Sequence, residues 1–397
     1  MGKGTTFESE ISTFNDSISG VQITKLTNYL THNFHTYFTN NGWYDQNKKL
    51  LIGSDRGNCT NLYSMELETG MLTQLTEFTK EDVAGVQGTY INPQKNEAYF
   101  TKNNTIVALN LDSLEEEEIY TSPEGYNLSN LSCTADGKHL AFGLSEDLSH
   151  RIKSNLGGGY IGFEEIEAAR PHSQICLLSL ETKENEVVHE ENRWIGHVNV
   201  SPTQSHLLSF CHEGPWEKVD HRIWLLDLQS KKVWKIRDGH PNQFAGHEYW
   251  HADGLHIGYH GFTESLTRKD GKFLGSIKYD NTNRKEYDFP YQNMHIHSND
   301  ESLIVGDGQQ ASAYHGETYK DCIFLWNKVE GRMGGPRILC KHRGSFQTQK
   351  VHVHPKLSPD KSQVLFTSDM DGYGNVYLAH IPPLESLPLL TDLLKNN

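Results

Sequence analysis

The run Leu50-Leu51-Ile52-Gly53-Ser54 is followed by a second apolar run, Asn61-Leu62-Tyr63-Ser64-Met65, and then by the turn-bounded stretch Leu72-Thr73-Gln74-Leu75-Thr76. Short apolar runs bounded by polar turn residues are typical of β-strands. The second run has counterparts at 105–109, 174–178, 222–226, 275–279, 322–326 and 375–379. The chain therefore contains seven copies of one strand-based unit.

The spacing of these units predicts the fold. They recur at intervals of about 44 to 69 residues, which fits the four-stranded blades of a propeller better than a sandwich, whose strands show no such period. The longest interval holds an insertion at about residues 150–172. We expect an all-β, seven-bladed β-propeller formed by residues 1–397 as a single domain.

The last unit lacks a good fourth strand. Near the N-terminus, the stretch Gln22-Ile23-Thr24-Lys25-Leu26-Thr27 resembles the strand that ends the first unit. We expect this N-terminal strand to close the last blade, because closure would remove the exposed sheet edges at the joint.

Composition narrows the class of protein. The net charge of −15 argues against a nucleic-acid partner, since binding to phosphates needs clustered Lys and Arg. The sequence has neither an apolar run long enough to cross a membrane nor an N-terminal signal-peptide pattern. The 6 cysteines are scattered without C-x-x-C spacing, which favours reduced thiols. We expect a cytoplasmic protein without a membrane partner, and the sequence does not indicate its oligomeric state.

Histidines recur in the segments that precede the polar turns, where the innermost strand of each blade would face the channel. These are His32, His35, His197, His247, His295, His297, His352 and His354. Alternate residues of a strand point to the same side, so each His-x-His pair is expected to share one face. Either pair alone could as readily lie at the surface by chance. Scattered surface histidines would not, however, recur at the same position in several blades.

These residues have the chemistry of a metal site. Together with Gln349, which lies three residues before His352, the imidazoles of His295, His352 and His354 would leave the charge of a divalent ion uncompensated. Such an ion attracts an anion. A neutral His247 in a neighbouring blade would be suited to accept a proton.

A second group of polar residues surrounds the turn Gly214-Pro215. It contains His212 and Glu213 before the turn and Arg222 after it. A guanidinium can grip a carboxylate at two points, although a salt bridge to Asp220 is an equal alternative for Arg222. No G-x-S-x-G or phosphate-binding glycine motif is present, so serine hydrolysis and phosphoryl transfer are not indicated.

Several stretches resemble the oligogalacturonate lyases. The likeness is specific between about residues 194 and 370 and looser before them; it is carried by 194–197, 211–215, 219–224, 247–250, 305–308, 339–342, 352–355 and 366–369. The resemblance implies a cytoplasmic seven-bladed propeller that cleaves short uronate oligomers by β-elimination with a bound divalent ion, manganese first.

By position, the resemblance implies metal ligation by His295, Gln349, His352 and His354, a base at His247 and a carboxylate-binding Arg222. We further expect His197, His212 and Glu213 to contact the substrate. Nickel, zinc and iron also accept imidazole. A non-catalytic propeller that binds a sugar or a protein is the alternative function, and a metal-dependent hydrolase is a third.

The chain departs from the family pattern near its N-terminus. Arginines of the family's first segments are missing from Thr31-His32-Asn33-Phe34-His35 and from Thr60-Asn61-Leu62-Tyr63. If those arginines hold substrate carboxylates, this protein prefers a different uronide, linkage or length.

Overall fold

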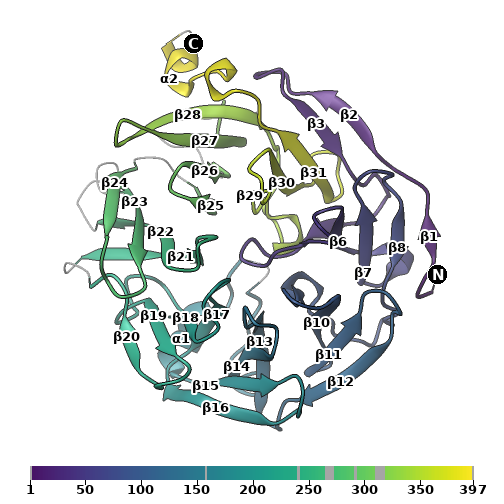
Figure 1. The fold of residues 1–397 in the computed structure, drawn as a ribbon, viewed down its shortest axis with the longest axis vertical. Coiled ribbons are helices and arrows are strands. Elements are labelled where there is room, and N and C mark those ends of the chain that lie inside the picture. Colours follow the sequence, from purple (N-terminus) through teal and green to yellow (C-terminus); the bar gives the residue numbers. More distant parts are fainter. Residues whose placement is uncertain are drawn as a thin grey trace.

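The strands of the protein form seven sheets arranged as a ring (Figure 1). The structure is a computed structural model that describes residues 2–156, 159–238, 242–263, 272–289, 293–308 and 318–395. The predicted all-β, seven-bladed β-propeller is confirmed.

The first four blades follow one another along the chain. Blade 1 contains β4 (Asn33–His35), β5 (Trp43–Tyr44), β6 (Lys49–Ser54), β7 (Asn61–Glu66), β8 (Leu72–Gln74) and β1 (Thr6–Phe7). Blade 2 contains β9 (Tyr90–Ile91), β10 (Glu97–Lys102), β11 (Thr105–Asn110) and β12 (Glu116–Thr121). Blade 3 contains β13 (Tyr126–Cys133), β14 (His139–Glu146), β15 (His172–Ser179) and β16 (Asn185–Asn192). Blade 4 contains β17 (Ile195–Val200), β18 (Leu207–His212), β19 (Ile223–Asp227) and β20 (Val233–Lys235).

The last three blades complete the ring. Blade 5 contains β21 (Gln243–Trp250), β22 (His256–Thr263), β23 (Lys272–Lys278) and β24 (Lys285–Asp288). Blade 6 contains β25 (Ile296–Asp300), β26 (Leu303–Gly306), β27 (Cys322–Val329) and β28 (Arg332–Lys341). Blade 7 contains β29 (Lys356–Leu357), β30 (Gln363–Ser368), β31 (Asn375–His380), β3 (Gln22–Lys25) and β2 (Ser12–Asn15).

The N-terminal segment closes the ring, as predicted. Ile23 of β3 pairs antiparallel with Ala379 of β31, and Lys25 pairs with Tyr377. The segment then does more than the sequence indicated, because β2 extends blade 7 and β1 pairs with β8 of blade 1 (Figure 1). Residues 6–15 therefore add outer strands to both blade 7 and blade 1 and span the joint between them; we call this segment the strap.

The hydrophobic core lies between the blades. Among the described residues, seven buried apolar clusters each join two neighbouring sheets. At the closing joint, Leu50 and Ile52 of blade 1 pack with Leu365 and Val376 of blade 7. Because both faces of each sheet are covered, the middle strands read as nearly continuous apolar runs, which is the pattern that revealed the repeat.

Helices are short and peripheral. α1 (Phe163–Ala169) lies between β14 and β15, where the sequence indicated an insertion, and α2 (Leu390–Lys395) packs on β28. The 3₁₀ helices are η1 (Arg56–Asn58), η2 (Val86–Gly88), η3 (Gln349–Val351) and η4 (Leu384–Ser386). Within the described ranges, no helix has the length and apolar character needed to span a membrane. All six cysteines are free thiols.

Candidate metal centre and active site

Three innermost segments present a histidine from an unusual backbone position. The register of β17 shifts at His197 and that of β21 shifts at His247, and both residues have a φ of 49°. His354 of blade 7 has a φ of 41°. Left-handed backbone is uncommon for a residue other than glycine. Bulges of this kind re-aim a side chain, so the chain itself turns these imidazoles away from the regular pleat.

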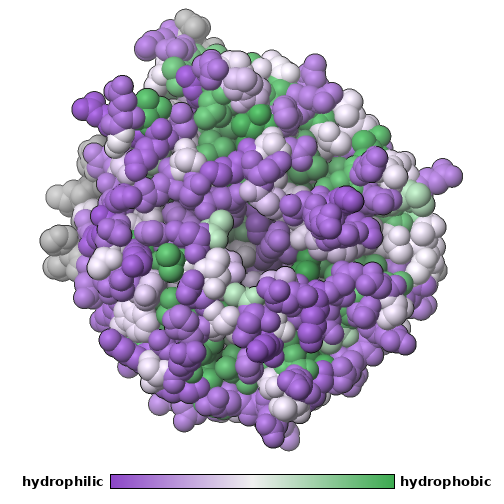
Figure 2. Space-filling view, viewed as in Figure 1, coloured by the Kyte–Doolittle hydropathy of each residue, from purple (hydrophilic) through white to green (hydrophobic). Residues whose placement is uncertain are grey.

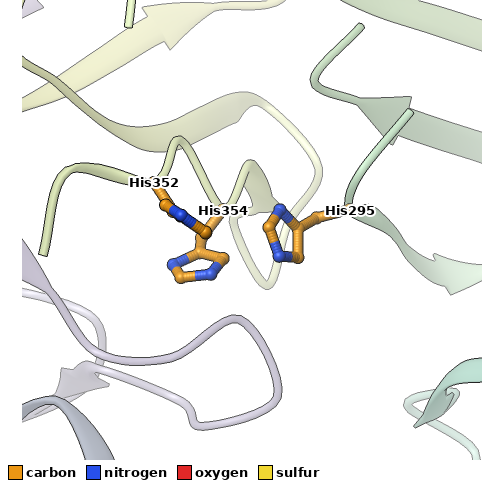
Figure 3. A group of neighbouring side chains, drawn as sticks. All are labelled: His295, His352 and His354. Atoms are coloured by element: carbon orange, nitrogen blue, oxygen red, sulfur yellow. The ribbon is translucent and has the colours of Figure 1, made fainter. Parts of the chain in front are cut away.

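His295, His352 and His354 form a compact group of imidazoles. One ligand nitrogen from each lies within 4.8 Å of the others, and all three side chains are buried. His295 comes from the start of blade 6, whereas His352 and His354 come from the segment that leads into blade 7 (Figure 3). The structure thus brings together three of the four predicted ligands. They come from two blades and from points about 57 residues apart in the sequence.

The local structure of this group differs from the prediction. Residues 349–354 were expected to form a strand, but Gln349–Val351 is a 3₁₀ helix and the nearby strand begins only at Lys356. The backbone N–H of His352 donates to the carbonyl of Gln349 at 3.3 Å. The backbone that carries Gln349 and His352 is therefore a turn and not a regular strand.

His297 also departs from the expected pattern. Its side chain is buried, and its Nδ1 accepts a hydrogen bond from the backbone N–H of Leu357 at 3.3 Å. It is not part of the three-imidazole group. His295 precedes β25 and His297 lies within the strand, and the two side chains have different partners.

The partners of the cluster suit a divalent cation. Nδ1 of His295 donates to Oδ2 of Asp307 at 2.8 Å, which leaves Nε2 as the ligand nitrogen. Asp307 is fully buried and also accepts from the backbone N–H of Met294 at 2.8 Å. A carboxylate behind a histidine is the usual arrangement around protein-bound metals. Nδ1 of His352 and both ring nitrogens of His354 are buried without any partner, an expensive arrangement that a bound cation would relieve.

Aromatic rings keep this group dry and neutral. The ring of Phe38 lies 6.0 Å from that of His354 in a stacked arrangement and 5.5 Å from that of His295. Burial lowers the pKa of His352 to about 4 and that of His354 well below its usual range. Neutral imidazole is the form that binds metals.

His247 lies next to the group of three imidazoles. Its ring centroid is 5.5 Å from that of His295. Burial lowers its pKa well below the usual value, and the positive charge of neighbouring side chains, including Arg222, adds to this effect. Its Nδ1 lies 2.8 Å from Nε2 of His260, and the two rings are stacked with an interplanar angle of 28°. His247 therefore has a neutral imidazole whose ring is held by a second imidazole.

Arg222 belongs to a buried ionic network. Its Nη1 donates to Oε1 of Glu213 at 2.9 Å, and its Nε lies 3.6 Å from Oε2 of Glu248. The guanidinium lies over the ring of Trp216. The alternative pairing with Asp220 is not formed. Burial alone would raise the pKa of Glu213, but the charge of Arg222 lowers it to about 2.

His197 completes this network. Nδ1 donates to Oε1 of Glu248 at 2.8 Å, and Nε2 lies 3.6 Å from Oε2 of Glu213. Burial opposes protonation of His197, yet the carboxylate of Glu248 raises its pKa. The network thus contains two carboxylates, one guanidinium and one imidazole, and Nε of Arg222 and Oε2 of Glu248 have no hydrogen-bond partner.

The remaining histidines brace the structure. His212 is held between Asp220, at 2.6 Å from Nδ1, and Glu191, at 2.9 Å from Nε2. Nε2 of His35 donates to the backbone carbonyl of His354, and Nδ1 of His32 accepts from the backbone N–H of Gly374. His32 and His35 thus contact the backbone of blade 7.

Comparison with known proteins identifies the family. The family model for oligogalacturonate lyase matches residues 1–385. The chain belongs to the oligogalacturonate lyase family. Curated relatives from Dickeya dadantii (strain 3937) and Pectobacterium atrosepticum, named oligogalacturonate lyase and oligogalacturonide lyase, are each 27% identical over 96% of this chain and 99% of their own length.

Solved structures of oligogalacturonate lyases also match. One is described as being in complex with manganese (TM-score 0.85, 26% identity, 96% of this chain and 99% of that chain). Another, from Vibrio parahaemolyticus, has the same TM-score and coverage at 28% identity. The predicted family and the prediction of a lyase are confirmed.

Three residues of this oligogalacturonate lyase family member have contacts that sequence reasoning did not assign. Asp307 and Glu248 lie in stretches that carry the family likeness, and their acidic type next to glycine or histidine was the available signal. His260 gave no signal, because it reaches His247 only through pairing of β22 with β21, where it lies opposite Gly246.

Proposed function

We propose that the protein is a metal-dependent lyase that cleaves short, uronate-containing oligosaccharides, oligogalacturonate first, by β-elimination. The proposal rests above all on one observation: a neutral His247 lies beside three buried imidazoles, two of which, His352 and His354, have ring nitrogens without partners. Elimination next to a carboxylate requires a base that accepts the proton and a positive charge that stabilises the carboxylate, and a metal-binding group beside His247 would supply both.

The ligand set is proposed to be His295, His352 and His354 with the side-chain oxygen of Gln349. Gln349 lines the same cavity of about 270 Å³ as His197 and Tyr37. When bound, a divalent ion would supply positive charge next to the uronate carboxylate and stabilise the developing negative charge. Manganese is the first candidate because a similar solved structure contains it.

His247 is proposed to remove the C5 proton of the uronate. The electron pair then forms the C4–C5 double bond as the C4–O bond breaks, and the departing oxygen takes up a proton from solvent to become a hydroxyl. His212 and His197 are less suited to this role: His212 has carboxylates at both ring nitrogens, and the carboxylate of Glu248 raises the pKa of His197. His260 would keep the Nδ1 proton of His247 on its own side, leaving the Nε2 lone pair for the substrate.

Arg222 is proposed to bind the carboxylate of the cleaved uronate. Glu213 and Glu248 fix the guanidinium from two sides, and Gly246 lets it approach His247, because a Cβ at that position would lie 2.7 Å from Nε of Arg222. Glu213 thus orients Arg222, and His197 and His212 are proposed to shape the same side of the site. The substrate is a small acidic oligosaccharide, and the free thiols favour a cytoplasmic location.

The proposal is tested by incubating the manganese-loaded protein with a panel of uronate oligomers. Ultraviolet absorbance of the conjugated C4–C5 double bond would support the elimination. A saturated reducing product without that absorbance would establish the hydrolase alternative. Binding of the sugar without turnover, in the wild type and in His247→Ala alike, would establish the non-catalytic alternative.

A further inference from the structure

The central channel of the ring contains a second chamber, which the proposed reaction does not use. It has a volume of about 250 Å³ and is lined by one residue from the innermost strand of every blade: Trp43, Tyr90, Ser132, Val200, Trp250, Ser298 and Leu357. It shares Thr39 and Asn199 with the cavity that contains His197 and Gln349. This far chamber therefore lies on the axis, next to the proposed active site. The face of the ring in Figure 2 is hollowed at its centre.

The far chamber contains one amine without a counter-charge. Lys356 lines it and is only 7% exposed, and its Nζ donates to the backbone carbonyl of Asn40 at 2.7 Å. An ammonium carries three donors, so this single bond leaves two of them unused. Among the described residues, no carboxylate pairs with Lys356 and none lines the chamber. A buried charge without a counter-charge is costly, so the amine favours an anionic ligand.

The other polar groups of the far chamber also suit an anion. Nδ1 of His297 accepts the backbone N–H of Leu357, so its proton is on Nε2, which makes it a donor. The walls are apolar and aromatic, formed by Phe38, Trp43 and Trp250 among others. An apolar cavity with a few fixed polar groups is the usual form of a small-molecule site.

The size of the chamber limits its ligand. A volume of about 250 Å³ lies just below the ~300–1,000 Å³ of sites for drug-sized ligands. One sugar ring with its carboxylate fits such a space, whereas an oligomer does not. We propose that the far chamber binds a single uronate monosaccharide, with its carboxylate on Lys356 and its ring against the aromatic wall. The choice of a uronate rests on the proposed function, whose end products carry this group.

Galacturonate binding tests this proposal separately from turnover. Wild-type protein is titrated with galacturonate by calorimetry, together with Lys356→Met, which keeps the length of the side chain, and Arg222→Met, which disables the proposed active site. We expect Lys356→Met to weaken one binding event by about tenfold or more, as loss of a charged hydrogen bond implies. Arg222→Met should retain that event.

Control ligands and a second variant make the outcome decisive. The methyl ester of galacturonate, which has no charge, should not bind the far chamber, and Lys356→Gln should behave like Lys356→Met if the latter unfolds. Binding that is equal in Lys356→Met and the wild type would overturn the proposal, as would displacement of galacturonate by an equal concentration of chloride. Crystals of the wild type soaked in galacturonate should show the sugar beside Lys356. Absence of lyase activity would count against the proposed function alone, because these titrations measure binding.

Discussion

His247 of β21 and His260 of the neighbouring strand β22 are joined by a hydrogen bond of 2.8 Å between Nδ1 and Nε2, although the residue opposite His260 is Gly246. Trp216 packs edge-on against both rings, at 5.2 Å from His247 and 5.7 Å from His260. The position and tautomer of the proposed base therefore depend on a residue that itself lies one strand farther from the axis.

Replacing His260 should slow the reaction more than it weakens binding. We expect His260→Ala to lower kcat by about 10- to 100-fold, the range found for residues that orient a reactive imidazole, with little change in KM. His260→Gln, whose amide oxygen can accept the Nδ1 proton, should recover part of the loss. Equal turnover in His260→Ala and the wild type would show that His247 needs no such support.

The metal site should depend on Asp307 as well as on its ligands. We expect Asp307→Asn to lower manganese affinity by about 10- to 100-fold, because His295 loses a charged partner, and His352→Ala to lose the ion. Metal content after dialysis measures both. His297→Gln is the matched control, since His297 bonds to the backbone and is not in the group. Full manganese occupancy in His352→Ala would refute the assignment.

Activity should persist into mildly acidic solution. The pKa of His247 is lowered well below 6.5 by burial and by neighbouring positive charge. A base acts only when unprotonated, so turnover should be constant above that pKa and fall as the pH drops through it. We expect the acid limb of kcat well below pH 6.5. Metal content is measured at each pH, because protonation of His352 also releases the ion; an acid limb above 6.5 with the metal retained would contradict the role of His247.

The strap across the closing joint should stabilise the ring. Arg56 is 2% exposed and forms two hydrogen bonds to the carboxylate of Glu10, at 2.6 and 2.8 Å. Removing one partner of a buried pair costs roughly 3–5 kcal/mol, and we expect Arg56→Ala to lie at the lower end because Glu10 is partly exposed.

Denaturant unfolding with a matched exposed pair checks this expectation. Lys218 pairs with Glu164 on the surface, so Lys218→Ala should change stability far less than Arg56→Ala, because solvent screens an exposed pair. A similar loss in the two variants would show that the strap adds no more than a surface contact.

The sequence was sufficient to predict the repeat but not the geometry of the site. Near-continuous apolar runs, such as the one that became β7, are imposed by sheets buried on both faces, so blade number and ring closure could be predicted. The left-handed backbone of His197, His247 and His354 could not be predicted, because a strand pattern in the sequence assumes a regular pleat. The contact between Arg222 and Glu248 could not be predicted either, because Glu248 comes from the next blade and only tertiary packing places it there.

Ring closure also fixes an order of events during synthesis. Thr27 and Val376 are joined by a hydrogen bond although 349 positions separate them. At ~5–20 residues per second, a ribosome needs about 17–70 s to make the intervening chain. Throughout that time the strand that becomes β3 can pair with β2 but not with β31, so one of its edges stays open and another chain can add to it. Nascent chains of this protein should therefore recruit chaperones until the final blade emerges, because only the last strands made can complete the sheet that the first strands began.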